Sequence, residues 1–152
     1  MAVGKSTVGR LLAEQLQLQF VDLDREIEKR EGRSISMLFG VSEAFFREKE
    51  TEVLCSLMSE KNIVLSLGGG TLHFGDNARR LQESFQLFTL QAPWELIEQR
   101  IVDSDRPLAR EARQLFVSRQ KGYEIGCQIR TEGRSPEQVK QEIVTYLRLD
   151  EP

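Results

Sequence analysis

The sequence has almost none of the residues from which zinc and redox sites are built. Its one histidine is His73, and its two cysteines, Cys55 and Cys127, lie far apart along the chain. Zinc ligands and redox pairs need Cys or His at short, regular spacings, so we expect neither kind of site. The favoured interpretation of the two thiols is that they are reduced and buried.

Long apolar runs and an excess of basic charge are missing as well. No stretch is long enough to span a bilayer, and the first residues lead directly into a loop and a helix, with no visible leader. The 21 basic and 24 acidic residues give a net charge of −3, whereas nucleic-acid-binding domains are usually basic. We therefore expect a cytoplasmic enzyme with no nucleic-acid or membrane partner. We also expect a monomer, although composition does not decide the oligomeric state.

Patterns typical of strands and helices alternate along the 152 residues, and no repeat or linker interrupts them. Helical spacing is found over 5–17, 24–31, 34–39, 43–60 and 75–83, and after Pro93 and Pro136; strand patterns are found over 20–24, 62–67, 85–90 and 126–130. This alternation predicts a single α/β domain with a parallel sheet and helices on both faces. Ligands of such sheets bind outside the carboxyl ends of the strands.

A partial phosphate-binding motif opens the chain. Gly4, Lys5, Ser6 and Thr7 match the closing part of G-x-x-x-x-G-K-[ST], whose first glycine would lie two positions before Met1. Backbone N–H groups around Gly4 and Lys5 can hold phosphate oxygens, the Lys5 ammonium can reach the β- and γ-phosphates, and the Ser6 hydroxyl can bind Mg²⁺. A strand normally precedes such a loop, and here it is absent. The alternative is a chance glycine and lysine at a helix start.

Two carboxylates follow at the end of the first predicted strand. Asp22 and Asp24 flank Leu23, and alternating side-chain directions would put both on the same side. One can act on Mg²⁺ through water, and the other can accept a proton from a substrate hydroxyl. The alternative is a solvated turn in which Asp24 caps a helix.

A triple glycine and three arginines complete the set. Gly68, Gly69 and Gly70 directly follow the apolar run 62–67, where glycine permits close backbone approach to a ligand, although a flexible turn is the alternative. Arg47, Arg106 and Arg119 are candidates for anion binding, but any single arginine is by default a surface residue. Only their combination with the other motifs gives them weight.

In order and spacing, this combination resembles the shikimate kinase family, small P-loop kinases of the nucleoside-monophosphate-kinase type. The resemblance covers essentially the whole chain and rests on the following residues: Gly4 to Thr7, Asp22 to Asp24, Phe46-Arg47, Gly68 to Gly70, Arg106-Pro107-Leu108, and Arg119 with Tyr123. It implies a three-layer α/β/α P-loop kinase fold with a central parallel sheet whose first strand is missing from this chain. Residues 1–152 would form one kinase domain, with a shikimate-binding part at about 24–52 and a lid at about 104–120.

The resemblance also implies a reaction and its residues. ATP would phosphorylate the 3-hydroxyl of shikimate to give 3-phosphoshikimate, a step of aromatic amino acid biosynthesis. Asp24 would hold the ring hydroxyls and take the proton of the attacking hydroxyl. The substrate carboxylate would be bound by Arg47 and Arg119, aided by the backbone of Gly68, Gly69 and Gly70.

The nucleotide would be held by a second set of residues. The resemblance assigns ATP binding to Gly4, Lys5, Ser6, Thr7, Arg100, Arg106 and Pro136, with Arg100 and Pro136 on the adenine, and Mg²⁺ to Ser6 and Asp22. Lys5 and Arg106 would act on the transferring phosphate as catalytic residues beside Asp24. The segment around 104–118 would close over the site and exclude water.

Two other hypotheses remain open at this point. One is a different small-molecule P-loop kinase, such as a gluconate kinase, against which the triple glycine and the place of Arg47 argue. The other is a non-catalytic nucleotide-binding module, because a missing central strand would leave its neighbours' edges unpaired.

Overall fold

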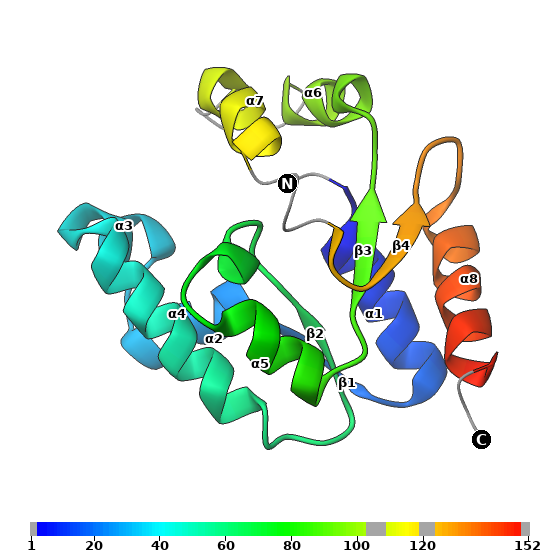
Figure 1. The fold of residues 1–152 in the computed structure, drawn as a ribbon, viewed down its shortest axis with the longest axis horizontal. Coiled ribbons are helices and arrows are strands. Elements are labelled where there is room, and N and C mark those ends of the chain that lie inside the picture. Colours follow the sequence, from blue (N-terminus) through cyan, green and yellow to red (C-terminus); the bar gives the residue numbers. More distant parts are fainter. Residues whose placement is uncertain (1–2, 103–108, 119–123, 150–152) are drawn as a thin grey trace.

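The computed structural model describes residues 3–102, 109–118 and 124–149 of the chain (Figure 1). Its elements are α1 (Lys5–Leu16), β1 (Gln19–Asp22), α2 (Leu23–Glu31), α3 (Ile35–Val41), α4 (Glu43–Leu57), β2 (Ile63–Ser66), the short 3₁₀ helix η1 (Thr71–His73), α5 (Asn77–Ser84), β3 (Phe88–Gln91), α6 (Trp94–Val102), α7 (Ala109–Ser118), β4 (Cys127–Arg130) and α8 (Pro136–Leu149). The predicted α/β architecture is confirmed.

Helices cover the strands on two sides, each with its own apolar core. On one side α1 packs against α8, and Val8 and Leu12 of α1 are buried with Ile143 of α8. On the other side α2 packs against α4, where Ile27 and Leu54 are buried. Figure 1 shows α8 on one flank of the strands and α4 with α5 on the other. This layering follows from helices with one apolar face each.

The strands form two parallel pairs. β1 pairs with β2, with Asp22 beside Ser66 at the carboxyl end, and β3 pairs with β4, with Gln91 beside Arg130. Between residues 3 and 149, as far as the structure describes them, no strand joins β2 to β3. The strands are parallel, as predicted, and a cavity of about 690 Å³ lies between the two pairs.

The helices of the 24–52 region begin and end where short polar residues and glycine allow it. The side chains of Ser34 and Ser42 accept hydrogen bonds from the backbone N–H groups of Met37 and Phe45, and so cap α3 and α4. Gly32 ends α2 in the left-handed conformation, at φ 63°. The three helices are thereby set side by side at the carboxyl end of β1.

One strand boundary and two helical elements differ from the sequence prediction. β1 ends at Asp22 rather than at Asp24, because the Asp22 carboxylate caps α2 by accepting a hydrogen bond from Arg25 N at 3.4 Å. Residues 109–118, within the predicted lid, form a helix that was not predicted, α7, whose Phe116 ring lies 5.4 Å from that of Trp94 of α6 between centroids. The turn after the triple glycine forms η1, which was not predicted.

None of the helices in the described part of the chain has the length and apolar character that crossing a membrane requires.

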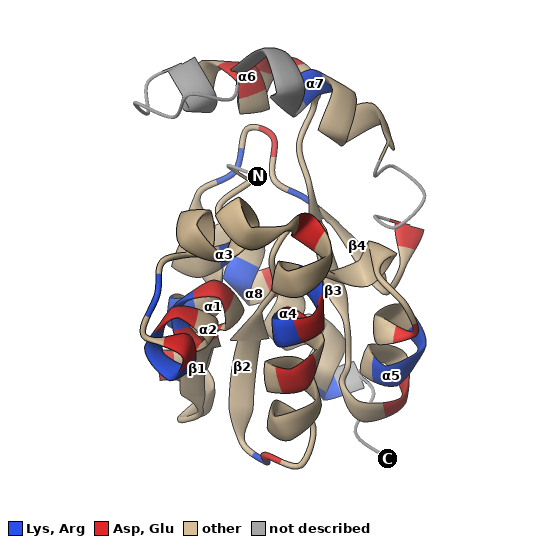
Figure 2. Ribbon diagram, turned by 90° about the vertical axis from the view of Figure 1, so that its left-hand side faces the viewer, with Lys and Arg blue, Asp and Glu red and all other residues tan. Residues whose placement is uncertain are grey.

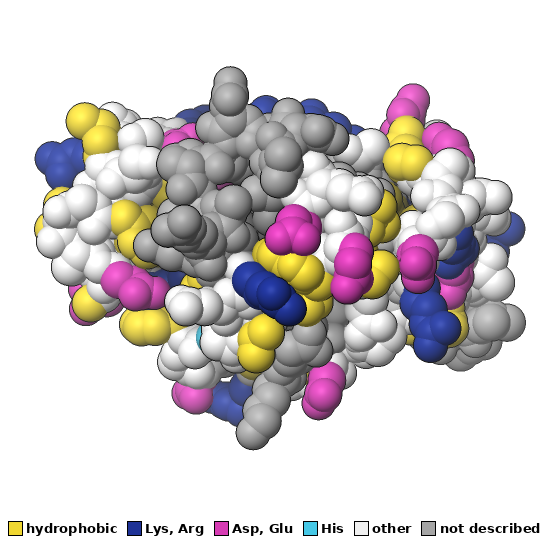
Figure 3. All heavy atoms as spheres, turned by 90° about the horizontal axis from the view of Figure 1, so that it is seen from above, with side chains coloured by type: hydrophobic (Ala, Val, Ile, Leu, Met, Phe, Trp, Pro, Cys, Tyr) yellow, Lys and Arg dark blue, Asp and Glu magenta, His cyan; other side chains and the backbone are white. Residues whose placement is uncertain are grey.

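Figure 3 looks onto the end of the molecule that carries α6 and α7, where acidic and apolar side chains lie next to each other. The described surface at this end is thus of mixed character.

Candidate active site

The amino end of α1 is shaped to hold an anion. Gly4 caps this helix of 12 residues and adopts φ 91°, which side chains other than glycine rarely adopt. The space around Gly4 is open, so the backbone conformation and not crowding requires glycine. Lys5, Ser6 and Thr7 form the first turn, and the helix dipole at such a helix start favours phosphate. The predicted phosphate-binding residues therefore lie together.

Ser6 and Asp22 connect this turn to the end of β1. Ser6 Oγ donates a hydrogen bond to Asp22 Oδ2 at 3.1 Å. A hydroxyl and a carboxylate oxygen are the hard ligands that Mg²⁺ prefers, usually completed by water and substrate phosphates. In the described residues no cluster of three or more His, Cys, Asp or Glu side chains offers an all-protein metal cage. The pair fits a magnesium ion that shares its coordination with a nucleotide.

Asp24 lies on the first turn of α2, not on the strand, so alternating strand directions do not explain its position. An added Cβ on Gly68 would be 3.2 Å from Asp24 Oδ1, so the triple glycine passes directly beside this carboxylate. Burial raises the pKa of Asp24, and the nearby charges of Asp22 and Glu50 raise it further, while Lys5 acts in the opposite direction. A carboxylate of raised pKa is the better proton acceptor near neutral pH.

Arg47 is a buried cation, with 7% of its surface exposed. Its Nη1 donates to Glu50 Oε2 at 2.7 Å, and Glu50, fully buried, accepts a second hydrogen bond from Thr71 Oγ1 at 2.6 Å. The guanidinium also lies 5.1 Å from the ring centroid of Phe46 and 5.8 Å from that of Phe39. Charge pairing and ring contacts hold the fork of Arg47 in one place, which suits recognition of a carboxylate.

The sequence prediction missed Glu50 and Thr71. Glu50 is three residues after Arg47 and therefore on the same face of α4, which is the signal that was available. Thr71 directly follows the triple glycine, but its contact spans 21 residues and no local pattern indicates it. Together they tie α4 to the glycine turn.

Gly70 is required by its contact with Arg47. A Cβ added at Gly70 would overlap the Arg47 guanidinium, and Gly70 itself is buried. Gly69 lies between Gly68 and Gly70 and lines the cavity near Lys5. The triple glycine thus brings backbone to both Asp24 and Arg47.

Substitution of Gly70 by alanine should raise the KM of the substrate that Arg47 binds by about tenfold or more, since displacement of a charged hydrogen-bonding partner costs roughly 1.5–3 kcal/mol. The KM for ATP should stay within about twofold. The measurement is steady-state kinetics with each substrate varied in turn. Gly40→Ala is the matched control, because nothing lies within 4 Å of its added Cβ and it is in α3. Unchanged kinetics for Gly70→Ala would show that Arg47 does not bind the substrate.

Four predicted residues are not placed at the site. Arg106 and Arg119 lie outside the described residues, and of Arg100 only the backbone, in α6, is described. Pro136 is exposed at the first position of α8, as a first-turn proline can be. The lid and the adenine contacts therefore stay predictions.

Charges of both signs surround the site. Figure 2 shows acidic and basic residues along α2 and α4, the helices that carry Asp24 and Arg47.

The site has the parts of a P-loop phosphotransferase with an anionic acceptor. These parts are a helix start for phosphate, a Ser–Asp pair for Mg²⁺, a carboxylate of raised pKa and a fixed arginine.

Comparison with known proteins identifies the family. The family model described as shikimate kinase matches residues 1–148, so the chain belongs to the shikimate kinase family. It is 40% identical to the shikimate kinase of Persephonella marina, over 97% of this chain and 94% of the relative. It is 38% identical to that of Aquifex aeolicus, over 97% and 91%.

Solved structures agree with this assignment. The shikimate kinase of Bacteroides thetaiotaomicron matches with a TM-score of 0.90 at 27% identity, over 97% of this chain and 94% of that one. The Acinetobacter baumannii shikimate kinase in complex with shikimate matches with a TM-score of 0.90 at 35% identity, over 99% and 90%. The predicted family, P-loop kinase fold, shikimate-phosphorylating activity and use of ATP and Mg²⁺ are confirmed.

Proposed function

We propose that Asp24, Arg47 and Lys5 of this chain divide the transfer of a phosphoryl group from ATP to the 3-hydroxyl of shikimate between them. The observation that carries this assignment is the glycine turn, which lies against the Asp24 carboxylate at Gly68 and against the Arg47 guanidinium at Gly70. A base and a carboxylate-binding guanidinium that both lie beside one short turn suit a small acceptor with hydroxyls at one end and a carboxylate at the other.

The carboxylate of shikimate binds to Arg47 in this proposal. Glu50 and Thr71 keep the guanidinium fixed, so little of its freedom is lost when the substrate arrives. Backbone N–H groups of the glycine turn add neutral donors. Arg119 is proposed as a second arginine of this clamp, on the strength of the family resemblance alone.

The hydroxyl end of shikimate lies at Asp24. Burial and the charges of Asp22 and Glu50 keep the proton affinity of Asp24 above that of an ordinary carboxylate. Asp24 can therefore accept a hydrogen bond from the 3-hydroxyl, orient it, and take its proton as the oxygen attacks. The acceptor is thereby positioned before transfer, which supplies most of the catalysis in phosphoryl transfer.

The phosphate end lies at the start of α1. The N–H groups of the first turn and the Lys5 ammonium bind the phosphate oxygens, and Ser6 with Asp22 would hold Mg²⁺. When bound, the ion neutralises charge on the β- and γ-phosphates. Arg106 is proposed to approach the transferring group from the lid, about residues 104–120, and Arg100 and Pro136 to enclose the adenine. The cytoplasmic location, the monomeric state and the single-domain division stay predictions.

Glu50→Gln should weaken shikimate binding by about tenfold, because Arg47 loses the charge that fixes it. It should also move the acidic limb of the kcat/KM profile to lower pH: Glu50 raises the pKa of Asp24, so its neutralisation lowers that pKa and the base is deprotonated earlier. Glu52→Gln is the control, since Glu52 is on the same helix but its side chain is 70% exposed. An unmoved limb, or an equal loss of ATP binding, would contradict these roles.

The substrate assignment is tested by ADP release with shikimate, its methyl ester and gluconate. We expect turnover with shikimate, at least tenfold weaker binding of the ester, which lacks the charge that Arg47 recognises, and none with gluconate. Turnover with gluconate alone would replace shikimate by the competing hypothesis. ATP binding without turnover on any acceptor would favour the nucleotide-binding module.

A further inference from the structure

A fully buried amide side chain stands at the start of α5. Asn77 is the first residue of this helix and 0% of its surface is exposed, although Asp76 before it and Arg79 after it are exposed. Burial of an amide costs free energy unless hydrogen bonds satisfy it. The partners of Asn77 therefore show what this position holds in place.

The Asn77 side chain connects three elements that are distant in sequence. Its Nδ2 donates a hydrogen bond to the backbone carbonyl of Thr71 in η1 at 3.2 Å. Its Nδ2 and Oδ1 also lie 3.1 Å and 3.3 Å from the Thr51 hydroxyl in α4. An asparagine that only caps a helix would bind the N–H groups of its own first turn. These bonds instead join α5 to α4 and to the turn after the triple glycine.

Thr71 is the link between Asn77 and the arginine of the site. While its carbonyl accepts from Asn77, its hydroxyl donates to Glu50 Oε1 at 2.6 Å, and its backbone N–H donates to Gly68 O at 3.3 Å. Glu50 in turn accepts from Arg47 Nη1 at 2.7 Å. A continuous chain of hydrogen bonds therefore leads from Asn77 to the Arg47 guanidinium.

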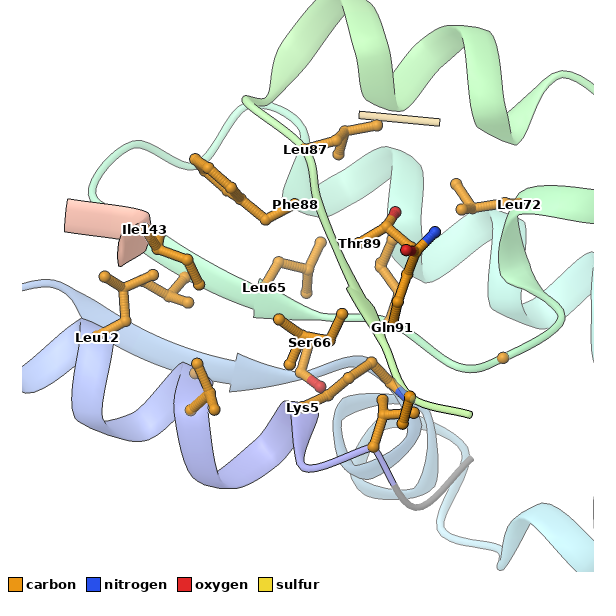
Figure 4. Close-up of a pocket in the computed structure, with 18 of the residues that line it drawn as sticks. Lys5, Leu12, Leu65, Ser66, Leu72, Leu87, Phe88, Thr89, Gln91 and Ile143 are labelled. Atoms are coloured by element: carbon orange, nitrogen blue, oxygen red, sulfur yellow. The ribbon is translucent and has the colours of Figure 1, made fainter. Parts of the chain in front are cut away.

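The glycine turn cannot fix its own place by side-chain packing, because its three residues carry no side chains. Thr71, at the end of the turn, is therefore an anchor for it. The next residue, Leu72, lines the cavity between the strand pairs (Figure 4), and an apolar contact of this kind is not directional. The hydrogen bonds of Thr71 to Asn77 and Glu50 are directional, so they set how the turn lies against α4.

Two hydrogen-bond bridges join α4 to the segment 71–77. One runs from Thr71 to Glu50 and the other from Asn77 to Thr51, and Glu50 and Thr51 are consecutive residues of α4. A single bridge would let the segment rotate about it, whereas two adjacent bridges hold it in one orientation. The direction in which Glu50 presents its second oxygen to Arg47 thus depends on both bridges.

We propose that Asn77 is a positioning residue for the acceptor: it holds Thr71, and through this contact keeps the Arg47 guanidinium aligned for the acceptor carboxylate. The inference rests on the proposed function, in which Arg47 binds that carboxylate. Asn77 is fully buried, so it acts through the residues that it contacts. Affinity for a charged carboxylate should therefore depend on Asn77, whereas affinity for ATP should not.

Asn77→Leu tests this role, since leucine has about the size of asparagine and makes no side-chain hydrogen bonds. Isothermal titration calorimetry gives the Kd of the wild-type chain and the variant for shikimate, shikimate methyl ester and ATP. We expect the Kd for shikimate to rise about tenfold, as when a buried hydrogen-bonding partner is lost, and the other two to stay within about twofold.

The ester distinguishes positioning of Arg47 from a general loosening of the fold. It lacks the charge that Arg47 recognises, so it cannot lose what the variant takes away. The preference of the wild-type chain for shikimate over the ester, at least about tenfold, should therefore nearly vanish in Asn77→Leu. The kcat at saturating substrates should stay within about threefold, because the role is in binding.

Two further variants complete the experiment. Arg80→Gln is the matched control: Arg80 also joins α5 to α4, through its Nη1 and Cys55 Sγ at 3.4 Å, but it is exposed and has no bond to Thr71 among the described contacts. It should leave the preference unchanged. Thr51→Val keeps the size of the side chain and removes its hydroxyl, so it should lower the preference about threefold. If Asn77→Leu does not fold, Thr51→Val decides.

Three results would overturn the proposal. Equal weakening of shikimate and its ester in Asn77→Leu, or the same loss of preference in Arg80→Gln, would mean that Asn77 only supports the fold. Unchanged affinities in Asn77→Leu and Thr51→Val would mean that the hydrogen-bond chain does not align Arg47. A wild-type chain that binds shikimate and the ester equally would instead refute carboxylate binding by Arg47, and the role of Asn77 with it.

Discussion

Asp24→Asn is expected to remove nearly all turnover and, at neutral pH, to make the folded chain more stable. Loss of a general base costs about 10²–10⁴ in kcat. The gain in stability has a separate cause: burial and repulsion from Asp22 and Glu50 oppose the ionised form of Asp24 in the folded chain, and asparagine carries no charge. The active-site carboxylate is thus expected to be kept at a cost in stability.

The sign of this effect depends on pH. A carboxyl whose folded pKa is raised above its ordinary value of 3.8 favours the folded state below that value and loses this contribution as pH rises through the folded pKa. The asparagine side chain of the variant does not titrate, so its advantage in Tm should be present near pH 7 and vanish below about pH 4.

Thermal unfolding between pH 3 and pH 7.5, together with steady-state kinetics, checks both parts of this expectation. Asp76→Asn is the control, because the Asp76 side chain is 64% exposed and lies outside the site. It should leave kcat unchanged and give no gain in Tm at neutral pH. A lower Tm for Asp24→Asn at pH 7, or turnover above about a tenth of the wild-type value, would contradict the role of Asp24.

Lys5→Ala should lower kcat by about 10²–10³, the usual cost of a lost group that stabilises charge in a transition state. Lys5 opens α1 next to the Ser6–Asp22 pair, where the phosphates would lie, and its charge also lowers the pKa of Asp24. The acidic limb of kcat/KM should therefore move to higher pH in the variant, opposite to its movement in Glu50→Gln.

Single-turnover kinetics at saturating ATP and shikimate separates this chemical effect from binding. Lys61→Ala, at an exposed position before β2, is the matched control and should react at the wild-type rate. A Lys5→Ala variant with near-normal single-turnover rates would rule out a role of Lys5 in the transfer step, whatever its effect on ATP affinity.

The sequence predicted those parts of the fold and the site that rest on local patterns. The positions of α1, α4, β2 and β4 follow from apolar periodicity, and Gly4 and Gly70 from the need for backbone without a side chain. The triple glycine and Asp24 were expected to meet because each follows a strand whose carboxyl end lies at the same edge of the fold, and a Cβ added at Gly68 would be 3.2 Å from Asp24 Oδ1.

What could not be predicted depends on contacts between distant residues. β1 ends at Asp22 because the Asp22 side chain caps α2. The sequence pattern extends to Asp24, so it predicted the end of this strand two residues too late. The Glu50–Thr71 hydrogen bond is set by how α4 packs against the glycine turn. The division into two strand pairs agrees with the expected unpaired edges, but alternation along the chain does not show which strands lie beside the gap; in the structure they are β2 and β3.

The most direct test of the account is the identity of the product that the 152-residue chain makes from ATP and shikimate. The measurement is two-dimensional ³¹P–¹H NMR of the reaction mixture, with ADP release followed in parallel. We predict shikimate-dependent ADP release and a phosphate coupled to the proton on carbon 3 of shikimate. A phosphate on another hydroxyl, or ADP release that does not depend on shikimate, would contradict the placement of the acceptor between Asp24 and Arg47.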